Sequence, residues 1–155
     1  MNKKTRILTV LLIMAMIFTI GCGSSGKNSD GYYNGIKWGS TIGDVEQKLG
    51  SDITVSEDKS SILQVVENFE GIEGSQAWVM YYFENNELCK IAIISSVLSD
   101  NATLSDDDLN SQLYDTLIKK YGECSDSSSL EKTWSTKNSV VTLSAGNSIK
   151  YVPNE

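Results

Sequence analysis

Residues 78–95, WVMYYFENNELCKIAIIS, decide the fold. Two segments rich in aromatic and β-branched residues, Trp78 to Phe83 and Leu88 to Ser95, flank the polar sequence ENNE, and such segments are typical of strands. Because Asn tolerates positive φ, ENNE is typical of a hairpin turn. A two-residue turn would pair Phe83 with Leu88, whereas a longer loop would exchange the two faces of the sheet. The stretch therefore predicts an antiparallel hairpin and leaves its register open.

Further strand patterns lie on both sides of this hairpin. One precedes it, at Ile62 to Glu67. Three follow it, and short polar sequences rich in Asn and Gly separate them as turns. These three are Lys132 to Thr136, Ser139 to Ser144 and Ile149 to Val152. Since the connections within each group are short, we expect antiparallel pairing throughout.

A first short helix is predicted upstream of the strands. Thr41 is a suitable N-cap, with Asp44 three residues later in the position of a capping box. Val45 and Leu49 supply an apolar stripe, and Gly50 takes the position just past the helix end. We therefore expect a helix between Thr41 and Gly50.

A second helix is predicted between the two groups of strands. Ser105 is its N-cap, and the acidic residues 106–108 lie at the positive end of the helix dipole. Gly122 ends it. An apolar residue recurs every four positions, which is the spacing of one helix face. These residues are Leu109, Leu113, Leu117 and Tyr121.

The element order predicts an α+β fold. We expect a two-layer domain in which two short helices pack on one face of an antiparallel sheet, in the order α-β(3-4)-α-β(3). Each predicted helix ends in Gly and is followed by consecutive strands, which hints at an internal repeat. The domain is expected to cover residues 35–155.

The N-terminus has the pattern of a secretory signal peptide. Lys3, Lys4 and Arg6 precede an uncharged stretch of 14 residues, Ile7 to Ile20. As a helix this stretch would span roughly 21 Å, less than the ~30 Å hydrocarbon core of a bilayer. Residues 1–21 are therefore predicted to be a cleaved signal peptide.

Cys22 is the predicted lipidation site. It follows the small residue Gly21, and the segment resembles a lipobox, although Thr19 stands where an aliphatic residue is usual. The Gly/Ser-rich residues after it suit a tether. We expect residues 22–34 to form a lipidated flexible linker and to hold the domain on the extracytoplasmic face of the cell membrane.

Most of the sequence between residues 35 and 152 resembles a known group of small bacterial lipoproteins. The opening sequence GIKWGST, residues 35–41, continues to Asp44, Val45 and the pair Leu49-Gly50. Later elements of the resemblance are Tyr81, Phe83, Leu88, Lys120-Tyr121-Gly122, Trp134, Val141 and Leu143. Together they resemble the SmpA/OmlA and β-lactamase-inhibitor-protein-like group. The resemblance implies a non-enzymatic role in protein binding or envelope assembly, and it carries over no functional residue.

The charge balance excludes two classes of partner. The chain has 13 basic and 20 acidic residues, and residues 1–21 contain three basic and no acidic ones. The remainder therefore has ten basic against 20 acidic residues, a net charge of −10. Nucleic acid binding needs a basic surface, and binding to anionic lipid needs Lys/Arg clusters. The membrane is thus expected to be reached through the lipid on Cys22 alone.

The residue types argue against catalysis and metal binding. The chain has no His, which is the commonest general base and metal ligand. We expect no enzyme activity, no metal and no cofactor. Cys89 and Cys124 remain after lipidation. They form either a disulfide, which export permits, or two free thiols, one packed in the sheet.

Aromatic residues supply the candidate binding face. If helices cover one face of the sheet, the other can present aromatic side chains to a partner. The candidate residues are Trp78, Tyr82, Trp134 and Tyr151. The sequence therefore favours a non-enzymatic module that binds an extracytoplasmic protein. The alternative is a lipoprotein that binds a small ligand or a cell-wall polymer in an aromatic pocket.

Overall fold

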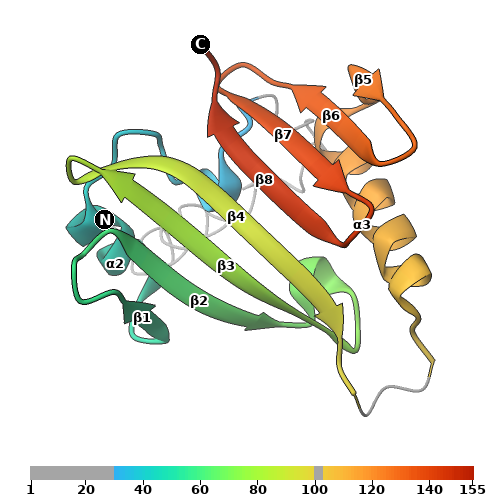
Figure 1. Cartoon of the computed structure of the whole chain (residues 1–155), viewed down its shortest axis with the longest axis horizontal. Coiled ribbons are helices and arrows are strands. Elements are labelled where there is room, and N and C mark those ends of the chain that lie inside the picture. The colour runs from blue at the N-terminus through green and yellow to red at the C-terminus, as the bar shows by residue number, and fades with distance from the viewer. Residues whose placement is uncertain (1–29, 100–102) are drawn as a thin grey trace, which may run out of the picture.

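The computed structural model describes residues 30–99 and 103–155 (Figure 1). The predicted signal peptide and Cys22 lie outside the described residues. The elements in chain order are η1 (Tyr33–Gly35), α2 (Ile42–Leu49), β1 (Ile53–Val55), β2 (Ser61–Glu67), η2 (Phe69–Gly71), β3 (Ser75–Glu84), β4 (Glu87–Val97), α3 (Asp106–Tyr121), β5 (Asp126–Ser127), β6 (Glu131–Ser135), β7 (Ser139–Ser144) and β8 (Ser148–Pro153), where η marks a 3₁₀ helix.

All eight strands form one antiparallel sheet, in the order β1-β2-β3-β4-β8-β7-β6-β5. Each half of the chain is a helix followed by a four-stranded meander. The two meanders join where β4 pairs with β8, with Ile93 opposite Ile149. The strand order is therefore symmetric about the β4–β8 pair. The internal repeat that the sequence hinted at is present in this topology.

The predicted fold class is wrong. The described residues form a mostly-sheet domain, one eight-stranded sheet with only two short helices of 8 and 16 residues. The helices bury narrow stripes, Val45 from α2 and three leucines from α3. Most of the core comes from the sheet itself, because alternate residues of six strands face inward. These are Ile62, Ala77, Val79, Tyr81, Phe83, Leu88, Ile91, Ile93, Trp134, Val141, Leu143, Ile149 and Tyr151.

The register of the central hairpin is that of the two-residue turn. Phe83 lies opposite Leu88, and Asn85 and Asn86 occupy the turn with φ of 51° and 65°. The register then shifts beside Tyr82, which lies opposite Lys90. This irregularity adds one residue to β4 and is a β-bulge. As a result β4 turns Leu88 toward the core and still brings Lys90 beside Tyr82 on the opposite face.

Both predicted helices are confirmed. The Thr41 hydroxyl accepts a hydrogen bond from the Asp44 backbone N–H at 3.3 Å and starts α2. Ser105 makes the same contact with Asp108 at 3.1 Å and starts α3. These reciprocal caps satisfy backbone donors that a helix N-terminus otherwise leaves free. A glycine at positive φ ends each helix, as predicted.

The first described residues are attached to the far end of the sheet. The Asn138 side chain donates to the Asp30 carbonyl at 3.0 Å, and the Trp38 indole donates to the Asn138 carbonyl at 2.8 Å. Tyr33 is buried. Residues 30–34 therefore pack against the folded domain. The described core runs from Tyr33 to Tyr151.

Candidate binding face

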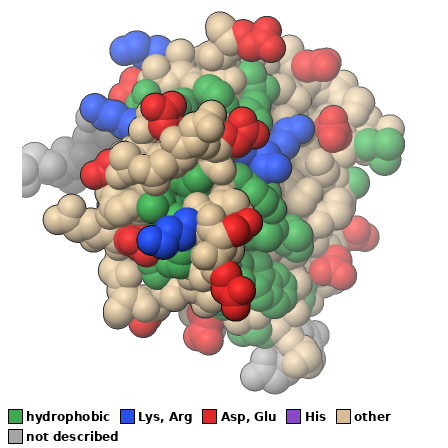
Figure 2. Space-filling model, turned by 60° about the vertical axis from the view of Figure 1, so that its left-hand side comes forward, with side chains coloured by type: hydrophobic (Ala, Val, Ile, Leu, Met, Phe, Trp, Pro, Cys, Tyr) green, Lys and Arg blue, Asp and Glu red, His purple; other side chains and the backbone are tan. Residues whose placement is uncertain are grey.

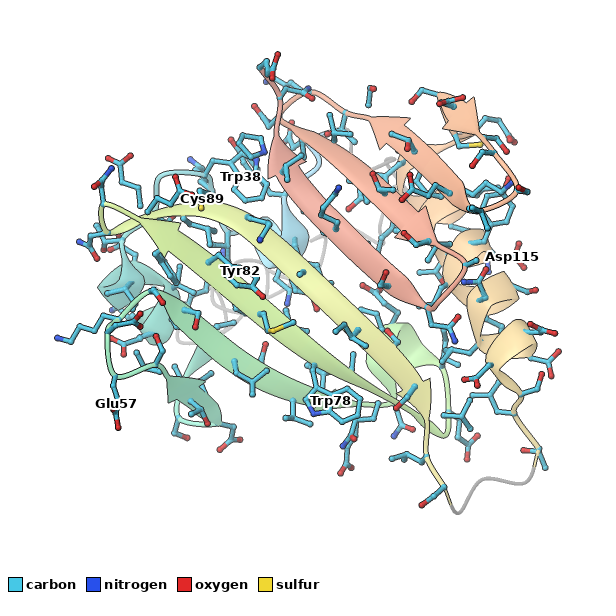
Figure 3. All side chains as sticks on the ribbon, in the orientation of Figure 1. Trp38, Glu57, Trp78, Tyr82, Cys89 and Asp115 are labelled. Carbon is cyan, nitrogen blue, oxygen red and sulfur yellow. The ribbon has the colours of Figure 1, made fainter. Side chains whose placement is uncertain are left out.

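The structure separates the four predicted aromatic residues into two pairs. Trp78 and Tyr82 lie on the face of the sheet that is turned away from the core (Figure 3). The assignment of Trp134 and Tyr151 to a binding face is wrong, because their side chains are 2 % and 0 % exposed in the core. The Trp134 indole also donates a hydrogen bond to the buried Gly122 carbonyl at 2.8 Å. Of the four predicted residues, Trp78 and Tyr82 are therefore available to a partner.

We call the face of the sheet opposite the core the open face. On it, Val65, Trp78 and Ile94 lie directly opposite one another across β2, β3 and β4. Leu63, Met80 and Ala92 form a second such row beside them. We call these six residues the apolar patch. Figure 2 shows hydrophobic side chains gathered in the middle of the molecule, with acidic side chains around them.

The apolar patch contains exposed side chains as well as half-buried ones. Four large hydrophobic residues in the described chain are exposed, and three of them are Val65 at 47 %, Trp78 at 37 % and Ile94 at 47 %. The fourth, Leu130, lies outside the patch, in the loop before β6. Scattered exposed apolar residues are normal, but a contiguous group marks an interaction surface. The cross-strand alignment makes this group contiguous.

The same two rows become polar where they cross into the second half of the sheet. Lys150 on β8 continues the row of Ala92, and Ser148 continues the row of Ile94. On β7 the next residues are Thr142 and Ser144. In these two rows the open face is thus apolar over β2 to β4 and polar over β8 and β7.

A hollow lies at the boundary between these two halves. Its wall includes Met80, Ala92 and Ile94 from the patch, together with Lys90 and Lys150. Tyr82 also lines it. The Lys90 amine lies 4.0 Å from the centre of the Tyr82 ring, a cation–π contact that holds both side chains in place. The Tyr82 hydroxyl donates to the Met80 sulfur at 3.3 Å.

Cys89 and Cys124 are both free thiols in the structure. Cys89 lies on β4, and its thiol donates to the Tyr82 carbonyl at 3.3 Å. Burial, and after it the charge of Glu84, raises the pKa of the Cys89 thiol. A raised pKa disfavours the reactive thiolate. Cys124 follows α3 and packs against the core.

A cluster of polar side chains on the core side of the sheet links α3 to η2 and β8. Lys120 of α3 forms an ion pair with Glu70 of η2 at 2.5 Å. Nearby, the Tyr121 and Tyr151 hydroxyls are hydrogen-bonded at 3.3 Å. Burial raises the pKa of Tyr151, Tyr33 and Tyr121. These phenols are therefore neutral structural groups.

Neither a metal site nor a membrane-spanning helix is found in the described part of the chain. Among residues 30–99 and 103–155, no three His, Cys, Asp or Glu side chains come together as metal ligands. In the same residues, no helix is long and apolar enough to span a membrane.

Comparison with known protein families, curated proteins and solved structures finds no match for this chain. The open face is therefore the feature of the described residues that points to a function. Sequence reasoning found Trp78 and Tyr82 and missed the rest of the patch and both lysines. The signal was present in β4, where Lys90, Ala92 and Ile94 alternate with buried Ile91 and Ile93. The register of β4 against β3 is needed to assign these residues to the open face.

Proposed function

We propose that this protein is a membrane-anchored, extracytoplasmic lipoprotein that binds another protein through the open face of its sheet. One observation carries the proposal: Val65, Trp78 and Ile94 are exposed and directly opposite one another. This proposal agrees with what the resemblance to the SmpA/OmlA and β-lactamase-inhibitor-protein-like group implies. No catalytic role is proposed.

The energy available at the patch suits protein binding. Fully burying one Val, Ile or Leu side chain stabilises a complex by about 1.5–3 kcal/mol relative to leaving it exposed. Val65 and Ile94 are about half exposed, so each retains roughly half of this gain for a partner. Trp residues are enriched among the side chains that dominate binding energies. Trp78 lies between Val65 and Ile94 and is therefore the expected centre of the interface.

The hollow favours a protein over a small ligand or a wall polymer. Small-ligand sites are enclosed and lined mostly by apolar and aromatic side chains. The hollow on the open face is a depression open to solvent rather than an enclosed cavity, and two lysines line it. The patch beside it is a broad surface across three strands, which suits contact with a surface of similar size.

Photo-crosslinking in intact cells tests the proposal. We expect that Trp78→p-benzoylphenylalanine forms a discrete crosslinked product with one protein partner. Gln112 is the matched control position, because it is exposed on α3, on the other side of the sheet. The Gln112 variant should give no such product. Equal products from both positions, or none from position 78, would contradict binding through the open face.

Anchoring is tested separately by Cys22→Ala. We expect the variant to move from the membrane fraction to the soluble fraction, because no other strong membrane-binding device is proposed and the remainder of the chain is acidic. Fractionation followed by immunoblotting measures this. A variant that stays in the membrane fraction after a high-salt wash would overturn the assignment.

Anchoring also limits where the partner can be. Cys22 is eight residues before Asp30, which is attached beside the β6–β7 turn. Eight residues span at most about 28 Å when fully extended. The partner crosslinked through position 78 is therefore expected to be a membrane protein or a protein held close to the membrane.

A further inference from the structure

Two lysines on the open face stand close together without an acidic partner. Lys150 lies opposite Ala92, and Lys90 is two residues from Ala92 on the same strand. The two lysines are therefore diagonal neighbours on adjacent strands, a position that places their Cα atoms about 7–8 Å apart. Among the described residues the ion pair is that of Lys120 with Glu70, and neither Lys90 nor Lys150 forms one.

This pair places two positive charges on neighbouring strands of an acidic chain. Residues 22–155 have ten basic and 20 acidic side chains. Two like charges on neighbouring strands repel each other. Lys90 is held over Tyr82 at the edge of the hollow and Lys150 is exposed. Both amines are thus available to an anion that enters the hollow.

The apolar patch lies immediately beside these amines. Ala92 belongs to the patch and is the direct neighbour of Lys150. Met80 belongs to it as well and lines the same hollow as Lys90. When a partner covers the patch, the partner's side chains at the edge of that contact therefore lie over the two lysines.

We infer that the partner presents an acidic side chain, Asp or Glu, next to large apolar side chains, with the carboxylate between Lys90 and Lys150 and the apolar groups on the patch. This inference rests on the proposed function and specifies its partner. Charge complementarity decides the occupant: a second copy of this chain is itself strongly acidic overall and would be repelled. Binding to an anionic bilayer needs a larger cluster of Lys or Arg side chains, and this pair is two lysines in an acidic chain.

A displayed library of random 12-residue peptides tests this chemistry on residues 23–155, which contain the whole described core. We expect the enriched peptides to carry Asp or Glu beside a large apolar residue. The best peptide is then synthesised with its acidic residue intact and as the amide, Glu→Gln or Asp→Asn. The amide should bind roughly five- to tenfold more weakly to the unmodified protein. The Lys90→Gln, Lys150→Gln double variant should bind both peptides equally.

The matched control is Lys119→Gln, Lys137→Gln, which makes the same charge change at exposed positions on α3 and the β6–β7 turn. It should discriminate between the two peptides as the unmodified protein does. Thermal denaturation of both double variants checks that each is folded.

The possible failures have different meanings. If the selected peptides lose binding with Trp78→Ala but carry no acidic residue, the open face binds proteins and the inference about the lysines is wrong. If no selected peptide depends on Trp78, the proposed function itself fails and the inference falls with it. Binding to phosphatidylglycerol vesicles that depends on Lys90 and Lys150, without peptide binding, would make a lipid surface the occupant and also overturn the inference.

Discussion

Replacing Trp134 by alanine is expected to lower the free energy of unfolding by about 3–5 kcal/mol, the usual cost of removing a buried Trp or Phe side chain. The ring is 2 % exposed and lies 5.9 Å from the ring of Tyr114. Its indole N–H satisfies the carbonyl of Gly122, which ends α3. The variant therefore loses packing, creates a cavity and leaves a buried carbonyl without its donor. Urea denaturation followed by circular dichroism measures the change.

Trp78→Ala is the matched control, because it removes the same side chain from the open face. We expect a loss of roughly 1 kcal/mol, since surface substitutions cost far less than core substitutions. Binding should respond in the opposite way: Trp78→Ala weakens it, whereas a folded Trp134 variant such as Trp134→Phe retains it. Equal losses of stability from the two alanine variants would contradict the placement of Trp78 on the open face.

Stability is expected to fall steeply above pH 10, because several tyrosines are buried as neutral phenols. Burial raises the pKa of Tyr33, Tyr81 and Tyr151 above the usual value near 10. Above pH 10 the unfolded chain loses these protons and the native chain keeps them. The native state then binds more protons, so the free energy of unfolding falls as the pH rises, by about 1.4 kcal/mol per pH unit for each such phenol.

Urea denaturation at pH 9.0, 10.0 and 11.0 measures this loss, and absorbance at 295 nm follows phenolate formation. Tyr81→Phe removes one titrating group and should make the dependence on pH shallower. Its phenol is hydrogen-bonded to the Gln64 side chain at 3.3 Å, so the variant is also expected to lose some stability at neutral pH. A stability that stays constant between pH 9.0 and 11.0 would show that these phenols are not buried.

Local features of this fold could be predicted from the sequence. The helix caps at Thr41 and Ser105 involve partners three residues away, so the sequence contains all that specifies them. The Asn85–Asn86 turn is equally local, because its residues need only to tolerate positive φ. Six of the eight strands were also predicted from their patterns. The two missed strands, β1 and β5, have three and two residues, which is too short for a period to show.

Non-local features could not be predicted in this way. The β-bulge beside Tyr82 changes which side of β4 each residue faces, and it is visible only in the pairing with β3. The pairing of β4 with β8 joins residues more than 50 positions apart and turns two meanders into one sheet. The predicted α+β class failed for this reason: the patterns showed each element and its length, but not that a single sheet supplies most of the core.

The candidate site shows the same division. By itself the sequence determined both α-helices and six of the eight strands, the absence of His, the acidic charge and a cysteine context typical of lipidation. It also showed that aromatic residues alternate along strands. Only the tertiary structure decided that Trp134 and Tyr151 face the core and that Trp78 and Tyr82 do not. The physical reason is that alternation gives a strand two faces, and packing against the rest of the chain selects the face that is covered.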